Sequence, residues 1–155
     1  MPGGLQKELR QTKPFRSLEV EAALSIARTA ARLDHGVAQA LKPFGLTPTQ
    51  YNVLRILRGA GAEGLCRNAV GERLVAPVPD VTRLLDRMED AALISRERSG
   101  TDRRFVTTRI TGKGLDLLDQ IDAPLAALHQ RQLGHLGKRN LKVLVDVLTE
   151  ARERL

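Results

Sequence analysis

Residues 77–114 read PVPDVTRLLDRMEDAALISRERSGTDRRFVTTRITGKG. Within this stretch, residues 79–92 place apolar side chains at helical spacing and polar side chains around the rest of the circumference. The apolar stripe consists of Val81, Leu84, Leu85 and Met88. Pro79 suits the first turn of a helix, where its missing N–H is not needed, and Asp80 suits the positive end of the helix dipole. The pattern therefore predicts a short amphipathic helix over residues 79–92.

Two short β-prone segments follow this helix. Residues 93–98 and 104–111 are predicted to be strands, the second because it contains Thr, Val and Ile. Residues 99–103, Ser-Gly-Thr-Asp-Arg, form a turn cluster that would join the two strands as a hairpin. A helix followed by a hairpin with a basic tip is the outline of a winged helix.

The same segment resembles the MarR family of winged-helix transcription regulators. The resemblance rests on VTRLLDRMEDAALISR from Val81, on the DRR triplet at residues 102–104 and on RITGKG at residues 109–114. It extends over about residues 18–155. It implies a mainly α-helical fold with a small β-hairpin wing, in which a winged helix-turn-helix is flanked by dimerisation helices.

Upstream of the predicted winged helix, the sequence predicts three more helices. Residues 17–43 form one long helix with Ser17 as its N-cap. Thr47 and Pro48 begin the next helix, as a cap followed by a proline in the first turn. Residues 66–75 form a short helix that, with residues 79–92, makes a two-helix DNA-reading unit.

Downstream of the hairpin, apolar residues recur at helical spacing in two further segments. Thr111 is expected to cap a long helix, Gly114 to serve helix packing, and Pro124 to kink that helix or end its first part. A second helix is expected over residues 141–155. One small core does not need all of this apolar surface, so we expect a partner subunit to cover it; an intramolecular bundle is the alternative. The predicted dimer interface comprises Leu125, Leu128, Leu141, Leu144, Leu148, Ala151 and Leu155.

These expectations divide the chain into three regions. Residues 1–16 are predicted to be a mobile arm, because they contain proline and glycine and no apolar period. Residues 17–45 and 112–155 make up the helical dimerisation region. Residues 46–111 make up the winged helix-turn-helix.

The charge of the chain favours a polyanionic partner. The sequence has 25 Lys and Arg against 18 Asp and Glu, a formal net charge of +7. Residues 96–109 contain five arginines and two acidic residues, whereas residues 112–155 are nearly balanced. Aromatic residues are 3% of the chain and scattered, which favours duplex DNA over stacked single strands. The chain has neither a run long enough to cross a membrane nor a leader, so we expect a cytoplasmic protein that does not bind membranes.

Residues that could support catalysis or metal binding form no known motif. His35, His129 and His135 lack metal-ligand spacing, and the sequence has no nucleophile elbow or phosphate loop, so we expect neither an enzyme nor a cofactor. Cys66 is the only cysteine. A helix N-terminus and the neighbouring Arg67 would favour redox sensing by its thiol, although packing as a small hydrophobic residue is the simpler interpretation.

The predicted DNA contacts come from the two-helix unit and the wing: Arg67, Asn68, Val78, Asp80, Thr82, Arg83, Arg87, Arg98, Asp102, Arg103 and Arg104. The resemblance implies that Arg104 enters the minor groove, that Asp102 holds it by a salt bridge, and that Arg103 is free for phosphate. Asp80 departs from the family pattern, in which a Ser or Thr is frequent near this position. A carboxylate there is unfavourable near phosphate but could accept a hydrogen bond from cytosine.

The resemblance implies a dimeric regulator, most often a repressor, that binds a pseudo-palindromic site and is released by a small aromatic or anionic ligand. The expected ligand pocket contains Arg28, Arg32, His35, Tyr51, Leu54, Leu115 and Leu118. Two alternatives remain open at this point: a regulator that responds to oxidation of Cys66, and a winged-helix protein-interaction module without specific DNA binding.

Overall fold

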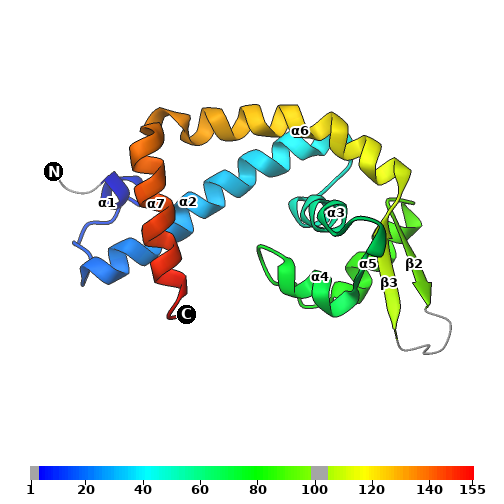
Figure 1. Ribbon diagram of the computed structural model, residues 1–155. Helices are drawn as coiled ribbons and strands as arrows, with labels where there is room; N and C mark the ends of the chain where they lie inside the picture. The colour runs from blue at the N-terminus through cyan, green and yellow to red at the C-terminus, as the bar shows by residue number, and fades with distance from the viewer. Residues whose placement is uncertain (1–3, 99–104) are drawn as a thin grey trace. The chain divides into compact units, whose positions relative to one another are not determined.

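The computed structural model describes residues 4–98 and 105–155. The chain divides into two compact units, one ending at Gly36 and the other running from Val37 to Leu155. The boundary falls within the long helix α2 (Leu18–Leu41), so this helix contributes to both units. Figure 1 shows the order of the elements along the chain.

The first unit contains α1 (Gly4–Glu8) and most of α2. The prediction of one long helix is confirmed, and Ser17 Oγ accepts a hydrogen bond from the Val20 N–H at 3.3 Å. Glu19 and Glu21 lie in the first turn of α2, where negative charge suits the helix dipole. The short helix α1 was not predicted, because five residues are too few to show a period; the mobility of residues 1–16 stays a prediction.

The second unit begins with the end of α2 and a 3₁₀ turn, η1 (Lys42–Phe44), before α3 (Pro48–Ala60). Thr47 and Gln50 form a reciprocal capping box at the start of α3, which confirms the predicted start of this helix. A second 3₁₀ turn, η2 (Gly61–Glu63), leads to α4 (Arg67–Arg73), and α5 (Val81–Asp90) follows. Both α4 and α5 are shorter than predicted.

The wing belongs to a three-stranded antiparallel sheet in the order β1-β3-β2. Strands β2 (Ile94–Arg98) and β3 (Val106–Ile110) pair with Ile94 opposite Ile110, as predicted for the hairpin. The sequence did not predict β1 (Leu65–Cys66), whose two residues pair with Thr108 and Thr107. Gly64 permits this pairing, because its φ is +66° and a Cβ there would collide with the Thr108 carbonyl.

The last part of the chain is helical. Thr111 caps α6 (Gly112–Leu133) by accepting from the Gly114 N–H at 3.1 Å, as predicted. A Cβ on Gly114 would lie 2.5 Å from the Leu93 carbonyl oxygen, so the packing role of this glycine is confirmed. Pro124 lies inside α6 and does not end it. A 3₁₀ turn, η3 (Gly134–Leu136), then leads into α7 (Gly137–Arg152), which ends before Leu155.

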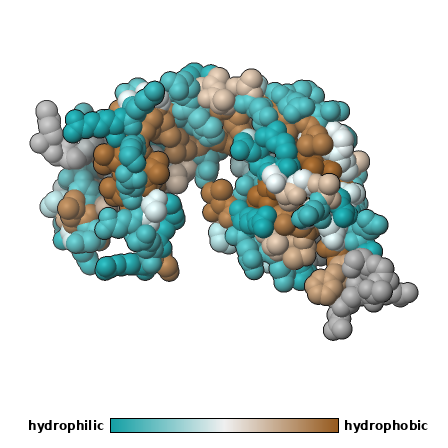
Figure 2. All heavy atoms as spheres, viewed as in Figure 1, coloured by the Kyte–Doolittle hydropathy of each residue, from teal (hydrophilic) through white to brown (hydrophobic). Residues whose placement is uncertain are grey.

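No residue of α7 is buried. Val143, Val145 and Val147 are 54%, 60% and 57% exposed, and Leu144 is also exposed. Figure 2 shows hydrophobic surface over this helix. Among the described residues, no helix is long and apolar enough to cross a membrane.

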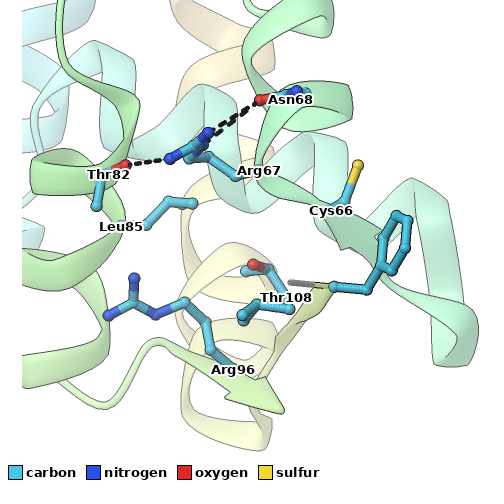
Figure 3. Close-up of a pocket in the computed structure, with 9 residues that line it drawn as sticks. Cys66, Arg67, Asn68, Thr82, Leu85, Arg96 and Thr108 are labelled. Atoms are coloured by element: carbon cyan, nitrogen blue, oxygen red, sulfur yellow. Dashed lines mark hydrogen bonds between the residues drawn. The ribbon is translucent and has the colours of Figure 1, made fainter. Parts of the chain in front are cut away.

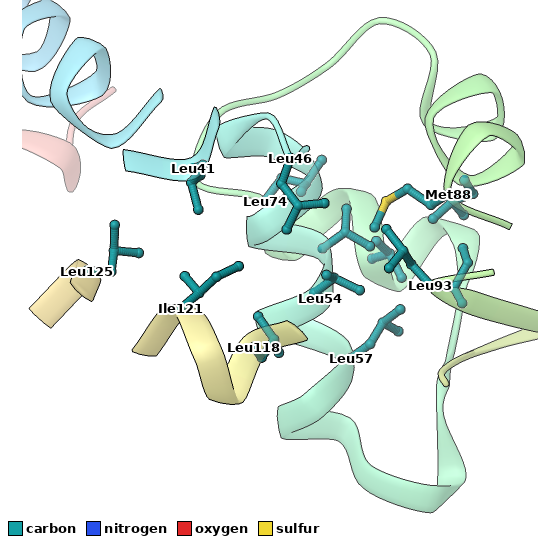
Figure 4. Close-up of a cluster of buried hydrophobic side chains, with 14 residues drawn as sticks. Leu41, Leu46, Leu54, Leu57, Leu74, Met88, Leu93, Leu118, Ile121 and Leu125 are labelled. Carbon is teal, nitrogen blue, oxygen red and sulfur yellow. The ribbon is translucent and has the colours of Figure 1, made fainter. Parts of the chain in front are cut away.

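The hydrophobic core of the second unit joins the end of α2, α3, α5, the sheet and α6 (Figure 4). Leu125 belongs to this core and is 3% exposed, so it packs within its own chain; its predicted place in a dimer interface stays a prediction. Leu128 is partly buried against the same core. The fully buried side chains include Leu41, Leu54, Leu57, Leu85, Met88 and Leu118.

Candidate nucleic-acid interface

Helix α5 has one buried face and one exposed face. Leu85 and Met88 are buried, whereas Thr82, Arg83 and Arg87 are exposed. The helix begins at Val81 and not at Pro79, because the Asp80 side chain caps it: Asp80 Oδ1 accepts a hydrogen bond from the Arg83 N–H at 2.9 Å. The core therefore fixes the orientation of α5 and leaves Arg83 and Arg87 exposed on its other face.

The start of α4 is tied to the start of α5 by Arg67. Its Nη1 donates to Thr82 Oγ1 at 3.0 Å, and its Nε and Nη2 lie 3.4 Å from Asn68 Oδ1 (Figure 3). The structure thus brings together three residues that the sequence analysis had placed in the interface separately. All three are exposed.

A groove of about 520 Å³ lies between α4, the connection from α4 to α5, and the first turn of α5. Five predicted DNA-contact residues line it: Arg67, Asn68, Val78, Asp80 and Thr82. Asn52 on α3 supports the connection, since its Oδ1 accepts from the Val75 N–H at 2.8 Å. Sequence reasoning missed Asn52, because nothing near it in the chain indicates a partner 23 residues away.

A second, smaller cavity of about 290 Å³ lies beneath Arg67, between α5 and the sheet (Figure 3). Its lining includes Cys66, Thr82, Phe105 and Thr108. Thr108 is 1% exposed, and its Oγ1 has no hydrogen-bond partner within the described part of the chain. A buried hydroxyl without a partner costs free energy, so this cavity suits a small polar group or water.

Arg96, one of the hairpin arginines, braces the wing against α5. Its Nη2 lies 2.6 Å from Asp86 Oδ1 and 2.9 Å from Glu89 Oε1. The hydrogen bond to Glu89 raises the pKa of Arg96, and the same bond lowers the pKa of Glu89. These contacts hold strand β2 on α5, so we assign Arg96 a positioning role.

Arg109 is also engaged within the protein. Its Nε donates to the Ala62 carbonyl at 2.7 Å, and its Nη1 lies 3.1 Å from Glu97 Oε2. Arg98, at the end of β2, is exposed. The predicted wing residues Asp102, Arg103 and Arg104 lie outside the described residues. The count of five arginines in residues 96–109 therefore overstates the charge available to a partner, because two of the five are paired.

A bidentate ion pair joins α3 to α6. Arg58 Nη1 and Nη2 lie 2.7 and 3.1 Å from the two carboxylate oxygens of Asp122. The hydrogen bond from Arg58 lowers the pKa of Asp122. This pair could not be predicted from the sequence, since the residues are 64 positions apart.

The predicted ligand pocket stays a prediction, and the structure shows the surroundings of four of its residues. Leu54 and Leu118 are fully buried in the core, so they do not line an open site. Arg28 Nε and Arg32 Nη2 lie 3.7 and 3.5 Å from the same carboxylate oxygen of Glu8. Both arginines therefore already face a carboxylate, that of the chain's own α1.

The other predicted pocket residues show no common site. His35 and Leu115 are exposed, and Tyr51 Oη accepts a hydrogen bond from Arg55 at 2.9 Å. Arg28, Arg32 and His35 belong to the first unit, whereas Tyr51 and Leu115 belong to the second. Among the described residues, no cluster of His, Cys, Asp and Glu could hold a metal ion.

Comparison with known proteins gives the same family from sequence and from structure. The model of the MarR family matches residues 44–104, which include α3, α4, α5 and β2. The HTH-type transcriptional regulator YkoM of Bacillus subtilis is 33% identical over 119 residues, which cover 74% of this chain and 75% of YkoM.

Solved structures extend the likeness over most of the chain. A MarR transcription factor from Planctomyces limnophilus is 38% identical, with a TM-score of 0.68 over 87% of this chain and 98% of that one. The transcriptional repressor CouR, bound to a 23-mer DNA duplex, is 25% identical, with a TM-score of 0.76 over 90% of this chain and 99% of CouR. The chain has a winged helix-turn-helix and is 33% and 38% identical to YkoM and to the Planctomyces limnophilus factor, respectively, over most of its length. It therefore belongs to the MarR family of winged-helix transcription regulators.

Proposed function

We propose that this regulator binds double-stranded DNA, with α5 in the major groove and the wing beside the adjacent minor groove. The observation that carries the proposal is the exposed polar face of α5. Thr82, Arg83 and Arg87 are exposed on this face, while the opposite face of α5 is packed in the core. A helix presented in this way has the width and the side chains to contact base edges and phosphates. The bound CouR structure supports the proposal by family relationship.

In this proposal the wing supplies a second contact. Arg98 would contact phosphate, Arg104 would enter the minor groove, and Asp102 would hold Arg104, as the family resemblance implies. The braces at Arg96 and Arg109 support this arrangement, because they fix the root of the hairpin on α5 and on η2. Arg103 would be free for phosphate.

We propose that two copies of the chain form a homodimer through the helices at both ends, residues 17–45 and 112–155. The exposed apolar side chains of α7 support this, because a partner would remove them from water. The residues assigned to the interface are Leu128, Leu141, Leu144, Leu148, Ala151 and Leu155. A two-fold dimer would bind a pseudo-palindromic site with half-sites about 10 base pairs apart. Residues 46–111 would read each half-site, and the protein would act as a repressor in the cytoplasm.

A small aromatic or anionic ligand is proposed to release the repressor from DNA. Arg28 and Arg32 remain the proposed carboxylate contacts, with His35 of the same unit as a further candidate. Their pairing with Glu8 supports this, because a ligand would replace an exposed ion pair that contributes little stability. Such a ligand would bind more tightly to a dimer in which the distance between the two α5 helices differs from one turn of DNA.

Oxidation of Cys66 is a second candidate for control. Cys66 is exposed and lines the cavity beside Arg67 and Thr82. A peroxide would convert the thiol to a sulfenic acid and release water, and the added oxygen would change contacts next to the reading helix. Phenolic acids and peroxide should therefore be titrated separately against the DNA complexes of wild type and Cys66→Ser.

The experiment that tests DNA binding is recovery of genomic fragments by the purified protein, followed by sequencing and gel shifts. We expect enrichment of a few fragments that share a pseudo-palindrome. A winged-helix protein-interaction module would show no preference above non-specific binding, and that outcome would replace the proposal. Binding must be compared at one salt concentration, because phosphate contacts weaken as salt rises.

A further inference from the structure

We infer that Asp80 makes this regulator select cytosine at one position of each half-site. The inference rests on the proposed DNA-binding function and concerns the sequence that α5 would read. Asp80 is the N-cap residue of α5 and lines the groove between α4 and the first turn of α5. Residues at the start of a reading helix are the ones that meet base edges.

Within the described residues 4–98 and 105–155, no basic side chain pairs with the Asp80 carboxylate. Its side chain is exposed, and among the described residues Asp80 forms no ion pair with an arginine or lysine, although Arg67 lines the same groove. Its contact with Arg83 is to the backbone N–H, not to the guanidinium. An uncompensated carboxylate in a surface that approaches phosphates opposes binding to DNA in general.

Capping fixes the direction of this carboxylate. One oxygen, Oδ1, is held at 2.9 Å by the Arg83 N–H, and the other has no hydrogen-bond donor among the described residues, so it can accept from a base. Holding the side chain in this way reduces the entropy lost when it meets a base. The same residue thus starts the helix and presents an acceptor to the groove.

The chemistry of the major groove selects the base. Guanine and thymine present only acceptors at their hydrogen-bonding positions and would repel a carboxylate. Adenine presents a donor at N6 beside an acceptor at N7, which is a partial match. Cytosine presents the N4 donor and no acceptor of its own in this groove, so a carboxylate over the cytosine can accept a hydrogen bond from it. Asp80 therefore weakens binding to half-sites with another base at this position, and half-sites with cytosine there are preferred.

Selection from randomised duplexes tests this inference, with wild type compared with Asp80→Asn and Asp80→Ser. Both replacements can cap α5, so the fold is retained. We expect wild type to enrich cytosine at one position per half-site, with a loss of roughly 5- to 150-fold on replacing that base pair. Asp80→Asn should lose the preference for cytosine, because its capping oxygen faces the Arg83 N–H and the remaining amide group is a donor, which suits the acceptors of guanine or thymine; Asp80→Ser should flatten the position. The other positions should keep their preferences.

Asp90→Asn is the matched control, because it removes one exposed negative charge from the last residue of the same helix. It should leave the selected sequence unchanged. Identical base frequencies for wild type and both Asp80 variants, or uniform flattening at all positions, would overturn the inference while leaving DNA binding intact. If wild type enriches no sequence, the proposed function fails first and the inference fails with it.

Discussion

Helices α5 and α7 both combine an apolar stripe with charged residues, but they use that stripe differently. In α5, Leu85 and Met88 are 1% and 0% exposed, because the helix lies on the core made by α3 and the sheet. In α7, Leu144 is 38% exposed and no residue is buried. The same periodicity therefore completes the core of the chain in α5 and leaves exposed apolar surface in α7, which we propose a second chain covers. The following experiments test whether the two helices have these separate roles.

The largest effect is expected from changing α7 at Leu144 and Leu148 together to glutamate. Since neither side chain is buried in the chain, the monomer should stay folded while charge in the proposed interface prevents dimerisation. Loss of the paired half-site should weaken operator binding by roughly 10²–10⁴-fold. Light scattering and circular dichroism would measure mass and fold.

Lys142→Glu is the control for this change, because it alters the charge of an exposed residue on the same helix. It removes only an i,i+4 pair with Asp146, which contributes a few tenths of a kcal/mol, so it should remain dimeric. A wild-type protein that is monomeric at micromolar concentration would contradict the role given to α7.

The opposite result is expected for the apolar face of α5. Met88→Ala should lower the free energy of unfolding by about 2–5 kcal/mol, because Met88 is fully buried and the change leaves a cavity. Denaturant titration would measure the loss, and the folded fraction should still dimerise. A cost below about 0.5 kcal/mol would mean that α5 is less firmly packed than the structure indicates.

On the exposed face of α5, Arg83→Ala should weaken operator binding without affecting stability. We expect a loss of roughly 1–3 kcal/mol if Arg83 contacts a base in bidentate fashion. Arg87→Ala should give a smaller loss that is similar for all sequences and a lower salt dependence, as for one phosphate contact. Operator titrations at two salt concentrations separate these results; equal affinity of both variants and wild type would remove α5 from the interface.

The smallest effect concerns the Arg58–Asp122 pair. Asp122→Asn should lower the free energy of unfolding by about 1 kcal/mol or less, because both side chains are partly exposed. Arg58 lowers the pKa of Asp122 in the folded state, so the ionised carboxylate stabilises the fold above the unfolded-state pKa. That contribution disappears as the pH falls through the lowered folded-state value.

The difference between wild type and Asp122→Asn should therefore be constant near neutral pH and shrink below about pH 4. Asp116→Asn, on the exposed surface of the same helix, should show no such dependence. Urea unfolding at several pH values would measure both variants. A difference that grows on acidification would contradict the assigned direction.

Much of this fold could be predicted from local pattern. The capped starts at Thr47 and Thr111, the stripe of α5 and the β2–β3 hairpin all depend on residues close together in the chain, so the sequence was enough to find them. The candidate DNA-contact residues on α4 and α5 were also predicted together. Their side chains are mostly basic or polar, as DNA contacts require, and their spacing along the chain resembles that of the MarR family. Their contacts with DNA, and the roles of Asp102, Arg103 and Arg104, stay predictions.

Only the tertiary structure decided which of the predicted site residues are exposed and unpaired enough to contact a partner. It placed Leu54, Leu118 and Leu125 in the core and paired Arg96 and Arg109 with acidic or carbonyl groups. It also added β1, whose two residues carry too little pattern to be recognised. The physical reason is common to all of these cases. Periodicity, caps and turns are local properties of a chain, whereas burial and ion pairing depend on which distant segments pack together, and the sequence alone does not show that packing.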